Sequence, residues 1–259
     1  MKFVLNADDF GLDDDTVKAT VACFDQHGLT SATIMVNMPS SEQALTFAKS
    51  HPEFSFGVHL TYVADTVEAP ILSPDELKSL TRADGRFRES KSVRKDALLH
   101  RLSVQEIAAE TEAQIGKALD CGVPVSHVDS HGHLHKFAPF QEALRSVLPK
   151  FGIRKVRMVQ DTYLRRPWKT PGYWLGPWMA RGIKSSFEST DHFYMPTTVF
   201  EKGWILPFID RVSHGKGCME VGFHPGNLEA WRADEARDCV ALAQELRKHG
   251  HSLCNWNDV

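Results

Sequence analysis

The sequence predicts an α/β fold built from parallel β/α units. Amphipathic, helix-like stretches repeatedly end at a glycine, and a short apolar, strand-like run follows each of them. This alternation extends over 259 residues, which is long enough to bury a sizeable core. No G-x-G-x-x-G and no G-x-x-x-x-G-K-[ST] follows the first predicted strand, so a nucleotide site on an open doubly wound sheet has no support. A β/α barrel is therefore favoured.

The predicted strands are short and apolar, and they alternate with the predicted helices. Strands are expected over residues 3–7, 32–36, 54–60, 125–129, 153–159, 218–223 and 252–256. Helices are expected over residues 15–27, 40–50, 103–121, 140–150 and 234–248. Two of the helices begin with capping-box sequences, Ser40-x-x-Gln43 and Ser103-x-x-Glu106.

Two stretches interrupt this alternation. Residues 64–102 are mixed and charged, and residues 160–207 are rich in Trp, Tyr and Pro. Both are too polar or too irregular to form layers of a barrel, so we expect long loops or small excursions over one face. No repeat, linker or second core is visible, and a single domain over residues 1–259 is expected.

Composition and charge exclude several classes of protein. The 30 Lys and Arg residues nearly balance the 33 Asp and Glu residues, which gives a net charge of -3 and no basic footprint for nucleic acid or an anionic membrane. No apolar run reaches the ~18 residues of a membrane span, and the start does not resemble a signal peptide. The five cysteines are scattered without a C-x-x-C pair, which favours reduced core thiols. We therefore expect a soluble, cytoplasmic protein.

Ionisable side chains gather where the predicted strands end. Catalytic groups of β/α barrels lie at the carboxyl ends of several strands. One Asp with two His residues is a ligand set for a single divalent cation that leaves positions open for water. The residues that fall at these strand ends are Asp8, Asp9, His59, Asp129, His131, His133, His135, Arg157, Glu220 and His224.

The adjacent residues Asp8 and Asp9 are expected to have two different chemical roles. Adjacent side chains on a regular strand point to opposite faces, but the alternation relaxes at a strand terminus. Asp9 can then bind a metal while Asp8 lies beside it and takes a proton from bound water. The competing interpretation is a helix N-cap with an acidic first turn, which explains Asp13, Asp14 and Asp15 better than the earlier pair.

The middle of the chain holds three alternating histidines, His131, His133 and His135. In an extended chain they share one face, and they cannot all bind one cation together with Asp9 and His59. His131 is the preferred ligand. His133 and His135 are expected near the metal or the substrate, and a ligand role for one of them stays open.

Four further residues near these strands have expected roles. Asp129 has the same strand parity as the histidines and is a natural orienting partner for one of them. Arg157 can orient Asp8 through a bidentate pair, although a structural salt bridge is an equal alternative. Glu220 is expected near the site, and His127 is interpreted as a buried structural histidine.

Four motifs resemble, in order and rough spacing, those of the YdjC/ChbG-like carbohydrate deacetylases. They are Asn6-Ala7-Asp8-Asp9-Phe10-Gly11, Gly57-Val58-His59-Leu60, His127-Val128-Asp129-Ser130-His131-Gly132-His133-Leu134-His135 and His224-Pro225-Gly226. The resemblance implies an irregular, incomplete TIM-like (β/α) barrel of the polysaccharide deacetylase type. It also implies a divalent cation and the removal of acetyl groups from N-acetylated sugars such as chitooligosaccharides.

The same resemblance assigns roles to individual residues. Asp9, His59 and His131 would be the metal ligands, Asp8 the base and His224 the acid that protonates the leaving amine. The family is usually described with magnesium, whereas two imidazoles and one carboxylate suit zinc. A homodimer is implied as well.

Two other functions remain as alternatives. A metal-dependent hydrolase of a phosphoester or another amide would be expected to carry H-x-H on its first strand or carboxylates for two metals, and neither pattern is present there. A sugar-binding protein on an enzyme scaffold would be expected to have lost Asp8 or a ligand.

Exposed tryptophans are predicted over the barrel mouth. Trp168, Trp174 and Trp178 lie within a Pro- and Gly-containing stretch, Tyr163 to Trp178, whose spacing is interpreted as a loop. Aromatic faces stack on sugar rings, so these residues are candidates for substrate contact. A dimer interface or a local aromatic cluster is the alternative.

Overall fold

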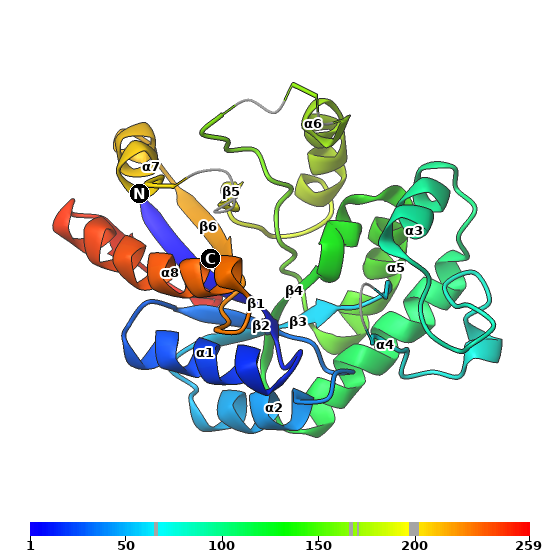
Figure 1. The fold of residues 1–259 in the computed structure, drawn as a ribbon. Coiled ribbons are helices and arrows are strands. Elements are labelled where there is room, and N and C mark those ends of the chain that lie inside the picture. The colour runs from blue at the N-terminus through cyan, green and yellow to red at the C-terminus, as the bar shows by residue number, and fades with distance from the viewer. Residues whose placement is uncertain (65–66, 166–167, 170, 197–201) are drawn as a thin grey trace.

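Seven parallel strands form one curved sheet in the part of the chain that the computed structural model describes, residues 1–64, 67–165, 168–169, 171–196 and 202–259. Figure 1 shows this sheet at the centre of the molecule with the helices around it. The strands are β1 (Lys2–Phe10), β2 (Ser31–Ile34), β3 (Ser55–Leu60), β4 (Val125–Ser130), β5 (His192–Tyr194), β6 (Cys218–Phe223) and β7 (Ser252–Leu253).

Most helices connect one strand to the next, as expected for β/α units. The α-helices are α1 (Asp14–Asp25), α2 (Ser41–Ser50), α3 (Ser90–Leu98), α4 (Val104–Asp120), α5 (Ala138–Val147), α6 (Pro171–Lys184), α7 (Ile205–Val212) and α8 (Ala230–Lys248). Short 3₁₀ helices are η1 (Pro74–Glu76), η2 (His131–Lys136), η3 (Leu148–Phe151) and η4 (Trp256–Asp258).

The sheet is a barrel that closes only in part. Its strand order is β4-β3-β2-β1-β6-β5, and β7 pairs with the beginning of β1. The predicted strand over residues 153–159 was wrong, because this segment makes only isolated bridges, from Val156 to Val128 and from Lys155 to Glu188. These two bridges extend the sheet from β4 toward β5 without regular strands. The result is the irregular, incomplete α/β barrel that the sequence predicted.

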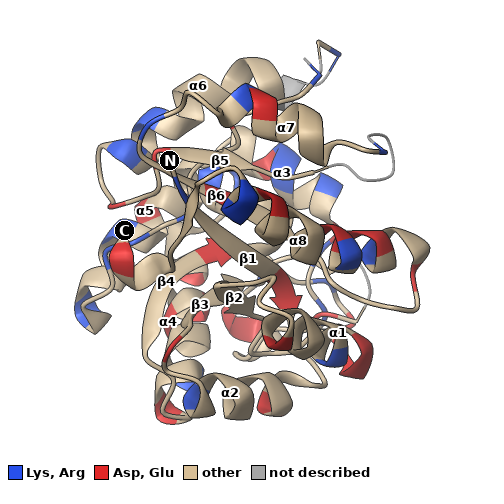
Figure 2. Ribbon diagram, turned by 90° about the vertical axis from the view of Figure 1, so that its left-hand side faces the viewer, with Lys and Arg blue, Asp and Glu red and all other residues tan. Residues whose placement is uncertain are grey.

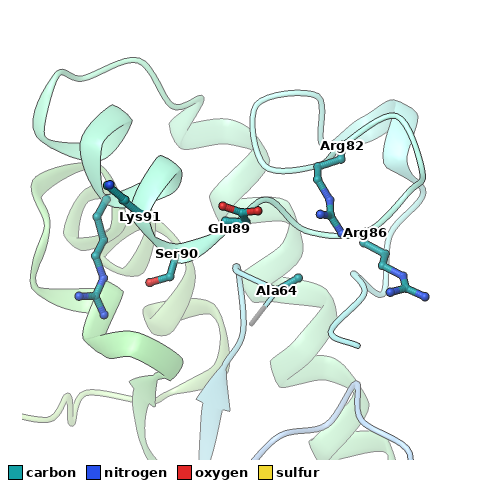
Figure 3. Close-up of a pocket in the computed structure, with 7 residues that line it drawn as sticks. Ala64, Arg82, Arg86, Glu89, Ser90 and Lys91 are labelled. Carbon is teal, nitrogen blue, oxygen red and sulfur yellow. The ribbon is translucent and has the colours of Figure 1, made fainter. Parts of the chain in front are cut away.

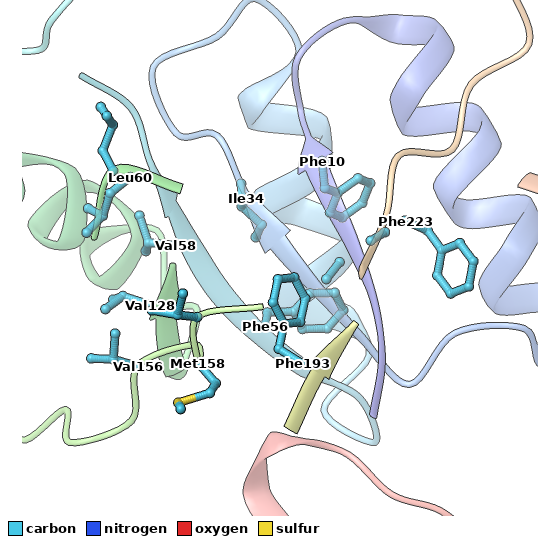
Figure 4. Close-up of a cluster of buried hydrophobic side chains, with 14 of the residues drawn as sticks. Phe10, Ile34, Phe56, Val58, Leu60, Val128, Val156, Met158, Phe193 and Phe223 are labelled. Atoms are coloured by element: carbon cyan, nitrogen blue, oxygen red, sulfur yellow. The ribbon is translucent and has the colours of Figure 1, made fainter. Parts of the chain in front are cut away.

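The core lies between the sheet and the helices. Every residue of β1 after Lys2 is buried, and so is every residue of β2 and β3. Figure 4 shows Val58 and Val128 close to Val156 and Met158, which belong to the irregular segment beside β4. Apolar burial of this kind contributes roughly 25 cal/mol per Å². The irregular segment is therefore held by packing as well as by its two bridges.

Charged residues lie mainly on the helices and loops around the sheet, as Figure 2 shows. The buried charged residues are exceptions, and most of them belong to the candidate site described below. Among the described residues, no helix has the length and apolar character needed to cross a membrane. All five cysteines lie in described segments and are free thiols.

The helix starts differ from the capping boxes expected from the sequence. Ser40 makes no side-chain cap bond, because its hydroxyl donates to Asp14 at 2.5 Å instead. Ser103 accepts from the Glu106 backbone N–H at 3.2 Å, but the Glu106 side chain accepts from Ser79. Tertiary partners therefore replaced the local partners of Ser40 and of the Glu106 side chain, whereas Ser103 keeps its local cap bond. The capping box that forms at α1 has Asp13 as its N-cap.

The second interruption is more regular than expected. Residues 160–207 contain α6 and contribute β5. Because β5 pairs with β6, the expectation that this stretch forms only loops or small excursions outside the layers of the barrel was wrong. Gln141 of α5 ties α6 to η2, since its side-chain amide donates to the carbonyls of Met179 and Lys136, both at 3.0 Å. Residues 64–102 contain η1 and α3.

One glycine in β3 permits a close approach of β4. A Cβ at Gly57 would lie 2.7 Å from the His127 carbonyl oxygen and 2.7 Å from its imidazole Cε1. We expect Gly57→Ala to lower the free energy of unfolding by about 1–3 kcal/mol, because the backbone of β4 would have to move. The measurement is urea unfolding.

Gly116→Ala in α4 is the matched control. Nothing lies within 4 Å of its added Cβ, and alanine favours the helix, so a gain of up to about 1 kcal/mol is expected. Equal effects of the two substitutions would contradict the steric account.

Candidate active site and metal centre

Asp8 and Asp9 lie at an irregularity inside β1 rather than at its end. The strand continues to Phe10, and its register with β2 shifts between Ala7 and Phe10. Asp9 has a φ of 58°, which is uncommon for a residue with a side chain. A bulge of this kind re-aims side chains. It relaxes the strict alternation of a strand at the two buried carboxylates.

Three candidate ligand atoms meet beside Asp9. Its Oδ1 lies 3.0 Å from His131 Nδ1 and 3.3 Å from His59 Nε2. Asp9, His59 and His131 offer one ligand atom each, and these atoms all lie within 4.8 Å of one another. The residues come from β1, the end of β3 and the start of η2.

Asp129 lies on the other side of His59. Its Oδ1 is 2.8 Å from His59 Nδ1, which fixes the orientation of the ring and leaves Nε2 facing Asp9. Burial lowers the pKa of His59, but Asp129 and Asp9 outweigh burial and raise the pKa to about 10. The negative charge that stabilises a proton on the His59 ring also stabilises a metal cation bound at the same place.

The chain after His131 is a turn, not an extended strand. Gly132 and His133 both have positive φ, 64° and 55°, so the expectation that His131, His133 and His135 share one face was wrong. His135 Nδ1 lies 2.8 Å from the Ser130 hydroxyl, and the His133 ring packs against Phe193 with centroids 5.8 Å apart. Neither histidine belongs to the cluster of candidate ligands found among the described residues.

A basic pocket of about 790 Å³ lies beside this turn. Arg94 holds the turn, since its Nη2 donates to the Gly132 carbonyl at 2.7 Å. The pocket lining, of which Figure 3 labels six residues, consists of Ala64, Arg82, Arg86, Glu89, Ser90, Lys91 and Arg94.

Arg157 is completely buried and binds three carboxylates. It makes a bidentate pair with Asp8, with bonds of 2.6 and 2.7 Å, and it donates to Glu220 at 2.7 Å. Its third partner is Asp129. Burial raises the pKa of Asp8, but the Arg157 guanidinium and the nearby imidazoles outweigh burial and hold the pKa well below its usual range. Asp8 is therefore ionised.

His224 directly follows β6, and its imidazole lies close to Asp8, which also binds Arg157. Its Nε2 lies 4.0 Å from Asp8 Oδ2, and its Nδ1 lies 3.1 Å from Glu235 Oε2. The His224 backbone N–H donates to the same Glu235 oxygen at 2.6 Å. Burial lowers the pKa of His224, but Glu235 outweighs burial and the net shift is upward. The site thus holds an ionised carboxylate and an imidazole that favours its protonated form.

Three residues at the site were not among the candidates chosen from the sequence, although Asn6 begins the first motif. Asn6 donates to Asp8 at 2.9 Å, and Arg232 donates to Asp9 at 2.8 Å. With Glu235, Arg232 lies in the first turns of α8, where charged residues are usually exposed. His127, by contrast, is the buried structural residue expected, stacked on Trp256 at 4.3 Å.

The tryptophans lie on a helix and in the segment before it. Trp174 and Trp178 are four residues apart on α6, so the prediction of a loop without helical spacing was wrong. Trp168, Trp174 and Trp178 are 57%, 60% and 58% exposed. Residues 166, 167 and 170 of this stretch lie outside the described residues.

The donor set fits a divalent cation. One carboxylate oxygen and two imidazole nitrogens lie close together, and a second carboxylate orients one of the imidazoles. Asp9 and His59 are buried, His131 is partly buried, and an ionised Asp8 is adjacent. Asp9 Oδ1 would be the ligand atom, because Oδ2 is bound by Arg232.

Comparison with known proteins agrees with these motifs. The sequence profile of a family described as "YdjC-like protein" matches residues 2–252. The chain belongs to this family. A carbohydrate deacetylase of Halalkalibacterium halodurans is 34% identical over 231 residues, which cover 88% of this chain and 86% of that protein. A carbohydrate deacetylase of Brevibacillus brevis is 37% identical over 135 residues, 52% of this chain and only 50% of that protein.

One solved structure has the same overall fold. It is a protein of Enterococcus faecalis V583 that is named, provisionally, as a cellobiose-phosphate cleavage protein. It superposes with a TM-score of 0.79 at 21% identity and covers 99% of this chain and 98% of that one. At this identity the likeness concerns the fold.

The burial of Glu220 predicts a pH-dependent effect of this residue on stability. Burial raises the pKa of Glu220 to about 7, above its ordinary value of 4.5. The folded state therefore binds this proton more tightly than the unfolded state, and stability that is present below the unfolded pKa is lost as the pH rises through the folded value. Glu220→Gln mimics the protonated form. We expect its stability relative to the wild type to increase between about pH 4.5 and about pH 7 and to level off above.

Urea unfolding of both proteins across this pH range is the measurement. A stability difference that does not change with pH would contradict the predicted titration of Glu220.

Proposed function

We propose that this chain is a metal-dependent carbohydrate deacetylase that removes acetyl groups from N-acetylated sugars. The observation that carries the proposal is the pairing of Asp8 and His224, 4.0 Å apart, directly beside the cluster of Asp9, His59 and His131. The relatives named carbohydrate deacetylase support the same activity.

Amide hydrolysis needs an activated nucleophile, stabilisation of the oxyanion and a proton for the leaving amine. A divalent cation held by Asp9, His59 and His131 would supply a water of lowered pKa and polarise the acetyl carbonyl. Asp8 accepts the proton of the attacking water, and Arg157 keeps it ionised and in position. His224 then donates a proton to the sugar amine, and Glu235 holds its ring in the required orientation.

The ligand chemistry supports zinc or another transition ion, because two of the three ligands are imidazoles. Magnesium, which the family resemblance implies, prefers oxygen ligands. The cytoplasmic location and the homodimer implied by the sequence stay predictions.

The test is acetate release from N-acetylated mono- and oligosaccharides by metal-stripped protein, with zinc or magnesium added back. We expect no release without metal and recovery with one of the two ions. Hydrolysis of a phosphoester without acetate release would favour the other class of hydrolase. Sugar binding without any hydrolysis would favour a binding protein.

Asp8→Asn is expected to keep the metal and the fold and to lower the rate by on the order of 10²–10⁴-fold, because it removes a base and not a ligand. His224→Ala is expected to behave similarly. Metal content by mass spectrometry and kcat for acetate release are the measurements. Loss of the metal from Asp8→Asn would show that the roles of Asp8 and Asp9 are exchanged.

The exposed aromatic side chains near the site are proposed to bind more distant sugar rings. Trp174 lines a pocket of about 500 Å³ together with Met158, which follows Arg157 in the chain. We expect Trp174→Ala and Trp178→Ala to lower kcat/KM for an oligosaccharide far more than for a single N-acetyl sugar, since only remote binding energy is lost. Equal losses on both substrates, or an altered molecular mass in light scattering without a kinetic effect, would favour a dimer interface.

A further inference from the structure

Arg232 extends from the first turn of α8 to the candidate metal centre, and its guanidinium contacts three residues. Its Nη2 donates to Asp9 Oδ2 at 2.8 Å, and its Nε donates to Glu229 Oε2 at 2.9 Å. The guanidinium also lies over the Trp231 ring, 4.5 Å from the centroid. The residue as a whole is only 8% exposed. Its position against Asp9 is therefore fixed by packing as well as by charge.

The two oxygens of Asp9 have different neighbours. Oδ1 faces the imidazole nitrogens of His131 and His59, at 3.0 and 3.3 Å, whereas Oδ2 faces Arg232. The left-handed backbone at Asp9, with a φ of 58°, sets the direction in which the side chain leaves the backbone. One oxygen is thus turned to the candidate cation and the other is occupied by a guanidinium.

We propose that Arg232 is a positioning residue that restricts Asp9 to a single bond with the cation. This inference rests on the proposed function, because it concerns the same metal. A carboxylate that uses both oxygens takes an additional coordination position. With Oδ2 bound to Arg232, that position stays free for water or for the acetyl oxygen of the substrate.

Arg232 also offsets the charge that Asp9 presents to the cation. A guanidinium beside a ligand carboxylate repels a divalent ion, so the protein binds the ion more weakly than an unpaired carboxylate would. The cation keeps more of its positive charge for polarising a bound water or carbonyl. Arg232 therefore lowers metal affinity and raises reactivity, which is the opposite of what a purely structural salt bridge would do.

The test compares Arg232→Gln and Arg232→Lys, and Arg237→Gln serves as the matched control. Arg237 lies on α8 as well, but its side chain is 74% exposed and paired with Asp234. Zinc affinity of the metal-stripped proteins is measured by calorimetry, which does not depend on acetate release. Thermal unfolding checks that each variant is folded.

Arg232→Gln is expected to bind zinc about tenfold more tightly and to release acetate more slowly. A unit charge roughly 5 Å from a divalent ion is worth about this factor even at the dielectric constant of water. Arg232→Lys keeps the charge and should stay close to the wild-type affinity, as should Arg237→Gln. Cobalt substituted into Arg232→Gln should also show weaker visible absorption than in the wild type, as expected for a higher coordination number.

Weaker or unchanged zinc binding by Arg232→Gln would overturn the proposal and leave Arg232 as structural support. An unchanged cobalt spectrum would overturn the single-bond part of it. If Arg232→Gln did not fold, Arg232→Lys would decide, because a loss of affinity despite the retained charge contradicts the electrostatic account. Absence of acetate release in the wild type would contradict the proposed function only, since the affinities are measured without substrate.

Discussion

The buried Arg157 guanidinium is the interaction on which the rest of the site depends. Its carboxylate partners Asp8, Asp129 and Glu220 come from β1, β4 and β6, and a fully buried charge shared among strands is stable only with such partners. Removing it would take the guanidinium partner away from the buried Asp8 and Glu220. The same guanidinium keeps Asp8 ionised beside His224. The ion pair that joins β1 to the segment after β4 therefore also favours the protonation state that the proposed base needs.

Two departures from regular backbone place the candidate ligands. The irregularity in β1, with its left-handed Asp9, redirects a carboxylate that a regular strand would point strictly to one face. β4 ends at Ser130, and the turn at Gly132 and His133 follows directly after His131. Strained backbone of this type persists only where surrounding contacts determine it. Here Arg232 holds Asp9 and Arg94 holds the Gly132 carbonyl. The candidate metal centre is therefore built from local irregularities that the regular sheet surrounds.

The sequence predicted the α/β class, and it singled out the residues of the two candidate ligand clusters, because strand ends in parallel sheets converge on one edge. These residues are Asp8, Asp9, His59, Asp129 and His131. It did not predict how these residues meet. The prediction that His131, His133 and His135 lie on one face of an extended strand was wrong. A turn at a glycine cannot be distinguished from a continuing strand without knowledge of the tertiary contacts. Arg232 and Glu235 were missed because charged residues in the first two turns of a helix are usually solvated. The prediction of a strand over residues 153–159 was wrong because this segment packs beside β4 with isolated bridges in place of a regular series of strand hydrogen bonds.

The most direct test of this account is an anomalous diffraction map of crystals grown with zinc. The account predicts one strong peak within roughly 2.0–2.2 Å of Asp9 Oδ1, His59 Nε2 and a ring nitrogen of His131. Asp8 should remain on Arg157 and off the ion. A peak between His133 and His135, or one bound by Asp8 and Asp129 without Asp9, would contradict the assignment of ligands and base on which the proposed chemistry rests.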